Sequence, residues 1–324
     1  MIAHAGQQAP SKQPLGFTPL VELPLSTYAP SLPLAPATSH IHVPRPAECV
    51  PCRSSSQVWA EVGHYRLRLA ESEEDLDAAC RLRFKVFNIE LGEGLESSYR
   101  TGLDRDQFDL CCEHLLVEDK LEENPARRIV GTYRMQSGTT AERNLGYYSE
   151  QEFSFAPYEP LRHGILELGR ASIDREHRTP EVLTLLWRGI AQYANDMGLR
   201  YLLGCSSINS RDPQVGWQMY RQLEHYRVSP EFETVPTAAY ACPTEQEGAQ
   251  AQPSPCPPDL NPDSMAPAPT KVPKLLKTYL AIGARIGGPP AWDREFGTID
   301  FLTLLDLKLL SASARNRFLA PLTQ

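Results

Sequence analysis

No run of apolar residues in this chain of 324 residues approaches the roughly 20 that a membrane-spanning helix needs. The first residues also lack the basic stretch, apolar core and cleavage site of a secretory signal. Lysine and arginine number 32 against 40 aspartates and glutamates, and the formal net charge of -8 argues against broad nucleic-acid binding. We therefore expect a cytoplasmic protein, either soluble or attached peripherally to the inner face of a membrane.

A disulfide framework is not expected, although the chain has eight cysteines. Such frameworks belong to small exported domains, and this chain is large and shows no export signal. Cys49 and Cys52 have the spacing of a redox or zinc pair, but a single CxxC without a second pair is a weak signal. We predict reduced thiols and no metal site. The eight residues are Cys49, Cys52, Cys80, Cys111, Cys112, Cys205, Cys242 and Cys256.

The 29 prolines are concentrated in two segments. Residues 1–57 contain few charges, many prolines and no sustained hydrophobic period, and residues 242–270 have the same character. Segments of this composition do not bury enough apolar surface to offset the entropy of ordering. We predict a disordered tail over 1–57 and one domain over 58–324, interrupted by a disordered insert at 242–270.

The remaining sequence alternates between strand and helix periods, which predicts a mixed α/β domain. A helix is expected after Ser72, where Asp75 completes a start like a capping box. Ser149 and Glu152 are predicted to cap another short helix. Two longer helices are predicted at 180–198 and 213–223, the first with proline near its first turn. Strands are predicted at 64–70, 113–119, 128–135, 165–174, 199–207 and 296–306.

The predicted strand ILELGRASID (165–174) carries two opposite charges, Glu167 and Arg170, on either side of Gly169. Regular pleating points residues three positions apart to opposite faces of a sheet. A bulge at Leu168–Gly169 would add one residue to the strand and bring both charges to one face. The alternative is an edge strand whose two charges are solvated.

Several other motifs follow one another along the chain. They are RLRFKVF (81–87), DRDQFD (104–109), CCEHLLV (111–117), GTYRM (131–135), LLWRGIAQY (185–193), YLLGCSS (201–207) and a last block over 272–306. Together with ELGRASID, and in this order, they resemble the ornithine lipid synthase type of N-acyltransferase. That type, also called hemolysin-like, belongs to the Gcn5-related N-acetyltransferase (GNAT) superfamily. The resemblance covers about residues 65–305 and extends more distantly to acyl-homoserine lactone synthases.

This resemblance implies an α/β (α+β) fold with a mixed, mostly antiparallel central sheet flanked by helices. In GNAT folds two neighbouring strands, here 165–174 and 201–207, diverge into a V that accepts the pantetheine arm of a thioester donor. The strand residues expected along the donor's path are Leu168, Gly169, Ala171 and Ile173.

The chemistry of acyl transfer gives the charged strand a function. An amine must lose a proton before it attacks a thioester carbonyl, and Glu167 at the mouth of the V is the expected base. Burial would raise its pKa toward neutral, and Arg170 would oppose that rise. Arg170 is alternatively expected to position the acidic motif or to hold a substrate carboxylate.

The acidic motif implies a site for the second substrate. The carboxylates of Asp104, Asp106 and Asp109 would attract the amines of ornithine. Arg83 or Arg134 would then meet the carboxylate of the amino acid. The alternative for the same residues is a structural network of ion pairs.

The loop before helix 180–198 departs from the usual GNAT pattern. Most GNAT proteins hold a pyrophosphate with glycine-rich backbone at this place, whereas DREHRTPEVL (174–183) has no glycine. The departure favours an acyl carrier protein over coenzyme A as donor, with Arg175, Arg178 and Arg188 as docking residues. The 4'-phosphopantetheine group would then arrive on the carrier, and the enzyme would need no metal or redox cofactor of its own.

We therefore predict transfer of a long acyl chain, with a 3-hydroxylated chain as one option, from acyl carrier protein to the α-amine of ornithine or a similar amino acid. The product would be a lyso-ornithine-type lipid. One alternative is an acyl-homoserine lactone synthase, which the block over 272–306 disfavours. The other is a catalytically silent module that binds acyl carrier protein or lipid, and Glu167 with the acidic motif argues against it.

Overall fold

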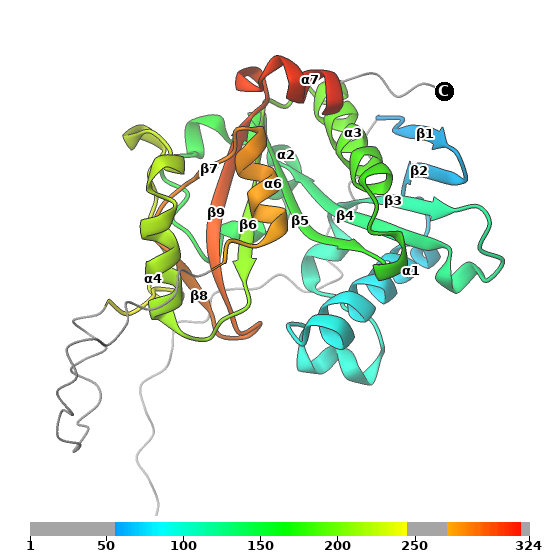
Figure 1. Cartoon of the computed structure of the whole chain (residues 1–324), viewed down its shortest axis with the longest axis horizontal. Coiled ribbons are helices and arrows are strands. Elements are labelled where there is room, and N and C mark those ends of the chain that lie inside the picture. The colour runs from blue at the N-terminus through cyan, green and yellow to red at the C-terminus, as the bar shows by residue number, and fades with distance from the viewer. Residues whose placement is uncertain (1–55, 245–270, 319–324) are drawn as a thin grey trace, which may run out of the picture. The chain divides into compact units, whose positions relative to one another are not determined.

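The computed structural model describes residues 56–244 and 271–318 of the chain (Figure 1). Almost all of the predicted tail (1–57) and of the predicted insert (242–270) lies outside the described residues. Among the helices that are described, none has both the length and the apolar character needed to cross a membrane.

Both predicted boundaries need a small correction, because Ser56 and Cys242 are buried in the folded part. The hydroxyl of Ser56 donates a hydrogen bond to Asp196 Oδ2 at 2.8 Å. Cys242 packs into an apolar cluster, as a reduced thiol with the character of a small hydrophobic residue does. Composition did not reveal these two residues, because one side chain at the edge of a segment hardly changes the average composition of that segment.

The described residues form one sheet of nine strands, and its order along the sheet is β1-β2-β3-β4-β5-β6-β9-β7, with β8 paired to β9 (Figure 1). Neighbouring strands are antiparallel except β5 and β6, which run parallel. This is the mixed, mostly antiparallel sheet that the sequence predicts. The strands are β1 (Trp59–Val62), β2 (Tyr65–Leu69), β3 (Glu113–Asp119), β4 (Ile129–Ser137), β5 (Ile165–Ile173), β6 (Tyr201–Ile208), β7 (Arg285–Ile286), β8 (Ala291–Asp293) and β9 (Thr298–Asp306).

Alternating side chains bury both faces of the sheet. Leu115 of β3 packs in the same apolar cluster as Leu186 of α3, whereas its neighbour Leu116 packs with Leu82 of α1. We call these two sides the α3 face and the α1 face; α6 and α7 also cover the α3 face. The helices are α1 (Glu73–Phe84), α2 (Gly138–Arg143), α3 (Pro180–Asp196), α4 (Pro213–Gln222), α6 (Lys274–Ile282) and α7 (Ala312–Phe318).

Capping residues define where the two longest helices begin. The Ser72 hydroxyl accepts from Asp75 N at 3.2 Å, as predicted, and α3 starts at Thr179 with proline in its first turn. The predicted cap at Ser149 and Glu152 is wrong. Ser149 lies inside a short helix over 148–150, and its hydroxyl is used by a carboxylate of the sheet instead.

Candidate active site

Strands β5 and β6 pair only over their first residues. Their parallel pairing ends at Glu167 and Leu203, although β5 continues to Ile173 and β6 to Ile208. Each strand keeps its other neighbour, since β4 pairs with β5 and β9 pairs with β6 along most of their lengths. The predicted V between the two strands is confirmed, but Glu167, expected at its mouth, stands at its closed end.

A bulge in β5 is present, two positions later than predicted. Gly169 still pairs with Arg134 of β4, and the extra residue lies at Arg170–Ala171, before pairing resumes at Ser172. Arg170 has a φ of 51°, a left-handed conformation that is strained for a residue with a side chain. The contacts of the Arg170 side chain, rather than the freedom of Gly169, therefore determine where the strand bulges.

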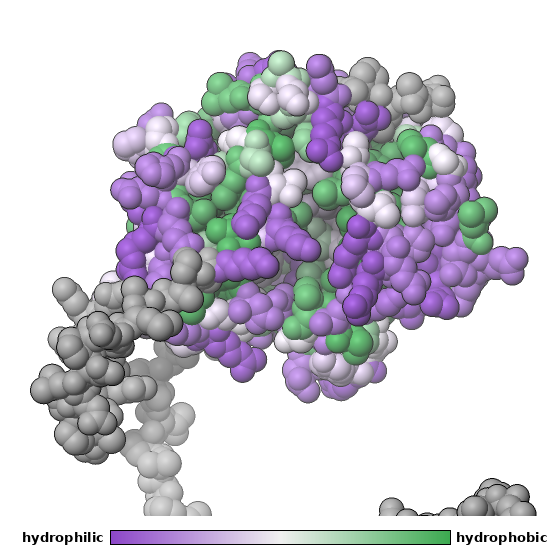
Figure 2. Space-filling model, viewed as in Figure 1, coloured by the Kyte–Doolittle hydropathy of each residue, from purple (hydrophilic) through white to green (hydrophobic). Residues whose placement is uncertain are grey.

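A cavity of about 770 Å³ extends through the V. Its size is typical of a site for a small molecule or cofactor. On the surface drawn in Figure 2, hydrophobic residues are exposed between hydrophilic ones in the middle of the molecule. The wall on the α3 face is apolar and includes Leu183, Trp187, Leu202, Leu276, Tyr279 and Leu305. The wall on the α1 face is polar and includes Arg134, Gln136, Tyr148, Ser149, Glu167 and Asp300.

Glu167 is 6% exposed and lines this cavity. Its carboxylate accepts from the backbone N–H groups of Tyr148 and Ser149 at 2.8 Å each, and from the Ser149 hydroxyl. Burial raises the pKa of Glu167, although these hydrogen bonds and the charge of Arg134 act in the opposite direction. A carboxylate has about four acceptor positions, so one remains for a substrate amine or a water molecule.

The acidic motif and three arginines form a network of ion pairs. Arg83, fully buried, donates to Asp104 Oδ1 at 2.9 Å and to both oxygens of Asp109 at 2.7 Å. Arg134 donates to both oxygens of Asp106, at 2.6 and 2.7 Å. Three aspartates thus face three guanidinium groups, since Arg170 binds Asp104 as well.

This network changes the role expected for the acidic motif. None of Asp104, Asp106 and Asp109 is among the residues that line the cavity, and neither is Arg83. Because each carboxylate is already neutralised by an arginine, the motif has no surplus negative charge to attract a cationic amine. The structural alternative stated for these residues describes the geometry better than the substrate site.

Arg134 and Arg170 do line the cavity. The guanidinium carbon of Arg170 lies over the rings of Phe87 and Phe296, at 4.3 and 4.8 Å from their centroids. Arg170 Nε also donates to Asp104 at 3.1 Å. Arg134 pairs directly across from Gly169, on the same face as Glu167. These two arginines are the cationic groups through which the network reaches the cavity wall.

The residues predicted to bind the donor separate into two groups. Leu168, Gly169, Ala171 and Ile173 of β5 line the cavity, as does Arg178. Arg178 is already engaged, since it donates to Glu90 at 2.6 Å and to the carbonyl of Ile173 at 3.0 Å. Arg175 is exposed and lies outside the cavity lining, whereas Arg188 donates to a backbone carbonyl of α7.

Sequence reasoning missed Gly204, which lies on β6 just beyond the end of the pairing with β5. A Cβ atom at this position would come within 2.2 Å of the carbonyl oxygen of Leu168. Only glycine therefore allows the two backbones to approach each other at the closed end of the V. The motif YLLGCSS contains this signal, because a glycine inside an apolar strand marks such an approach.

We expect Gly204→Ala to push β5 and β6 apart beside Glu167. The displacement should cost about 1–3 kcal/mol of unfolding free energy and lower turnover roughly 10²-fold. Thermal unfolding and steady-state kinetics measure the two effects. Gly164→Ala is the matched control, since its Cβ would meet no atom closer than 3.8 Å and should change neither quantity. Equal behaviour of the two variants would refute a special role for Gly204.

The sequence is similar to known acyltransferases. Residues 82–188 match the family described as Acetyltransferase (GNAT) domain. An L-ornithine N(alpha)-acyltransferase of Rhizobium meliloti is 32% identical, with 82% of this chain and 87% of that protein covered. A protein of the same name from Brucella abortus is 31% identical, with 79% and 89% covered.

Solved structures show weaker likenesses. The AHL synthase LasI is 12% identical with a TM-score of 0.44, over 81% of this chain and 98% of that one. FeeM, an N-acyl amino acid synthase from uncultured soil microbes, is also 12% identical with a TM-score of 0.44, over 79% and 96%.

Proposed function

Because the chain belongs to the family of L-ornithine N(alpha)-acyltransferases and is an N-acyltransferase, we propose that it acylates the α-amine of ornithine with a long acyl chain. The observation that carries this proposal is the V between β5 and β6. It connects an apolar compartment on the α3 face with a polar compartment on the α1 face, and Glu167 lies in the polar compartment at the closed end of the V.

The apolar compartment is suited to the acyl chain. Trp187 and Tyr279 line it, with ring centroids 5.7 Å apart, together with aliphatic side chains such as Leu183 and Leu305. Burying each methylene of an acyl chain there contributes about 0.8 kcal/mol. A thioester whose pantetheine arm lies in the V would then present its carbonyl carbon near Glu167.

The polar compartment supplies the proton chemistry. Glu167 accepts one proton from the ammonium of the acceptor, and the freed amine nitrogen forms a bond to the thioester carbonyl carbon. The carbon–sulfur bond then breaks, the second proton that the nitrogen loses passes to the leaving thiolate, and Glu167 releases its proton to solvent. The raised pKa of Glu167 suits this role, because burial makes its carboxylate a stronger base than an ordinary glutamate. Amide formation from a thioester needs no metal or redox cofactor.

We propose acyl carrier protein as the donor, and a 3-hydroxylated chain as one substrate. The turn that precedes α3 contains no glycine. The hydroxyl of Thr179 already accepts the N–H of Val182 at 3.3 Å, so part of the helix N-terminus that would bind a pyrophosphate is occupied. Arg175 is exposed at this turn and is the cation best suited to meet an acidic carrier.

The test uses the purified enzyme with ornithine and one acyl chain, presented either on acyl carrier protein or on coenzyme A, with products identified by mass spectrometry. We expect N-acyl ornithine, formed faster from the carrier, and a carrier preference that Arg175→Glu reduces roughly tenfold or more. Products that contain another amino acid, or lactones, would refute the proposed acceptor. A preference for coenzyme A would refute only the proposed donor.

A further inference from the structure

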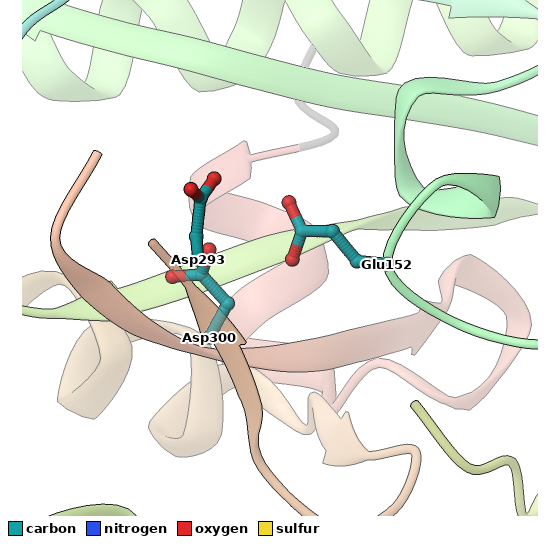
Figure 3. A group of neighbouring side chains, drawn as sticks. All are labelled: Glu152, Asp293 and Asp300. Atoms are coloured by element: carbon teal, nitrogen blue, oxygen red, sulfur yellow. The ribbon is translucent and has the colours of Figure 1, made fainter. Parts of the chain in front are cut away.

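Three acidic side chains that the acyl-transfer chemistry does not use meet beside the cavity (Figure 3). Glu152 follows the short helix over 148–150, Asp293 ends β8, and Asp300 lies on β9. The carboxyl group of Glu152 points toward the two aspartates (Figure 3), and one oxygen from each of the three residues lies within 4.8 Å of the others. The three residues are 0%, 2% and 3% exposed, respectively.

This carboxylate cluster, Glu152, Asp293 and Asp300, contrasts with the acidic motif described above. Within the described residues no lysine, arginine or histidine nitrogen lies within 4.0 Å of its oxygens. Asp293 accepts two backbone N–H groups, at 2.8 and 3.0 Å. No N–H or hydroxyl group of the described chain donates to either oxygen of Glu152 or to Oδ1 of Asp300.

Unpartnered buried carboxylates are costly to a folded protein. The hydrogen-bonding neighbours left to Glu152 are Asp300 and the thiol of Cys205. Burial, followed by the charges of Asp300 and Asp293, raises the pKa of Glu152 well above its usual range. Burial is also the main cause that raises the pKa of Asp300, to about 6. The cluster is therefore a place where a cation would relieve an unfavourable arrangement.

Two members of the carboxylate cluster share a cavity with Glu167. Asp293 and Asp300 both line it, as Glu167 does, whereas Glu152 is not part of the lining. Glu167 of β5 pairs with Leu203 of β6. Further along β6, at alternate positions, are Cys205 and then Ser207, which pairs with Asp300 of β9. Residues two apart on a strand point to the same side, so all these side chains lie on the α1 face.

We propose that the carboxylate cluster binds a primary ammonium group of the acceptor, namely the side-chain ammonium of ornithine, while the α-amine faces Glu167. This assignment rests on the proposed function and adds the residues that select the acceptor. It also replaces the acidic motif, whose charges are already paired with arginine, as the source of attraction for a cationic amino acid.

The geometry suits an ammonium group. Such a group has three N–H donors and no acceptor, which matches three carboxylates that each offer one oxygen. The centre of a triangle with edges of 4.8 Å, the upper limit here, lies about 2.8 Å from each corner. That is an ordinary length for a hydrogen bond between a cationic nitrogen and a carboxylate. Calcium and magnesium ions take oxygen ligands at about 2.0–2.6 Å, closer than the centre of this triangle lies to its corners.

The experiment compares two acceptors with the same carbon chain, ornithine and 2-aminopentanoic acid, which lacks the side-chain amine. Using the full-length enzyme and one acyl donor, we expect the wild type to favour ornithine in kcat/KM roughly 10- to 100-fold. Asp300→Asn and Glu152→Gln should each bring that ratio close to one. Glu295→Gln removes an exposed carboxylate from the same hairpin and should keep the wild-type ratio.

A second measurement distinguishes selectivity from support of the fold. Because each amide variant replaces a buried carboxyl group that has no cationic partner, its thermal unfolding temperature should equal or exceed that of the wild type. A large fall in unfolding temperature in both variants would show that the cluster is structural and would overturn the assignment.

The outcomes separate this inference from the proposed function. A wild-type enzyme that acylates ornithine and 2-aminopentanoic acid equally well overturns the role of the cluster but leaves ornithine acylation standing. An enzyme that acylates other amino acids and not ornithine overturns both. Elemental analysis that finds one equivalent of a divalent metal in the wild type, absent from Asp300→Asn, would replace the ammonium by a metal ion.

Discussion

Glu167→Gln should lower turnover by roughly 10²-fold or more, because the amide accepts no proton from the attacking amine. The carboxylate that it replaces is buried at the closed end of the V and held by three hydrogen bonds. Steady-state kinetics at saturating acyl donor measures the loss. Circular dichroism and thermal unfolding are the controls. The amide oxygen still accepts from the N–H and hydroxyl of Ser149, which both bind Oε1, but the amide NH2 group then faces the N–H of Tyr148, which binds Oε2.

The pH dependence of this variant identifies the role of Glu167 as a base. As the pH approaches the pKa of the acceptor's amine, a growing fraction of that amine loses its proton without help. The ratio of wild-type to variant turnover should therefore shrink as the pH rises. A folded variant with wild-type turnover at neutral pH would exclude Glu167 as the base, and a constant ratio across the pH range would point to a positioning role.

Asp109→Asn should destabilise the protein by about 3–5 kcal/mol, because it removes one partner from a buried ion pair. Asp109 is 2% exposed and binds Arg83 through both oxygens, and Arg134 Nη1 lies 3.1 Å from Oδ1. Chemical denaturation measures the loss. Asp106→Asn is the graded comparison. The Asp106 side chain is 19% exposed and Arg134 keeps Asp109 as a partner, so the change should cost less, about 1–3 kcal/mol.

The stability that Asp109 contributes to the folded protein should decrease as the pH falls. Burial raises the pKa of Asp109, but the charges of Arg83 and Arg134 outweigh it and hold the pKa well below its usual range. A depressed pKa contributes stability that is present above the unfolded value, about 3.9, and is lost as the pH falls through the folded value. The difference in unfolding free energy between wild type and Asp109→Asn should thus persist down to about pH 4 and become smaller below it. A difference below 1 kcal/mol at neutral pH would contradict the structural role of the acidic motif.

The sequence was sufficient to predict the fold and the central feature of the site. Ordered motifs identified the sheet and the diverging strands, and the charge at Glu167 stood out because a buried strand has little other use for it. These signals are local: a glycine in a strand, an acid between apolar residues, or a serine followed three positions later by an aspartate.

The remaining features depend on tertiary contacts that no local pattern contains. The bulge lies at Arg170 because Asp104 and two aromatic rings hold its side chain, and Asp104 is 66 residues away. Glu152 and Asp300 resemble ordinary solvated acids in the sequence, and only the pairing of β6 with β9 brings Asp300 onto the face that also carries Glu167. The acidic motif was over-interpreted because its arginine partners are spread over α1, β4 and β5.

The central claim is that an acyl-thioester arm lies between β5 and β6 and ends at Glu167. A crystal structure of the enzyme with a non-hydrolysable acyl-pantetheine, in which a thioether replaces the thioester, tests it most directly. The account predicts the pantetheine between the two strands, the sulfur next to Glu167 and the acyl chain against Trp187 and Tyr279. An arm bound elsewhere on the protein, with the space between β5 and β6 unoccupied, would contradict it.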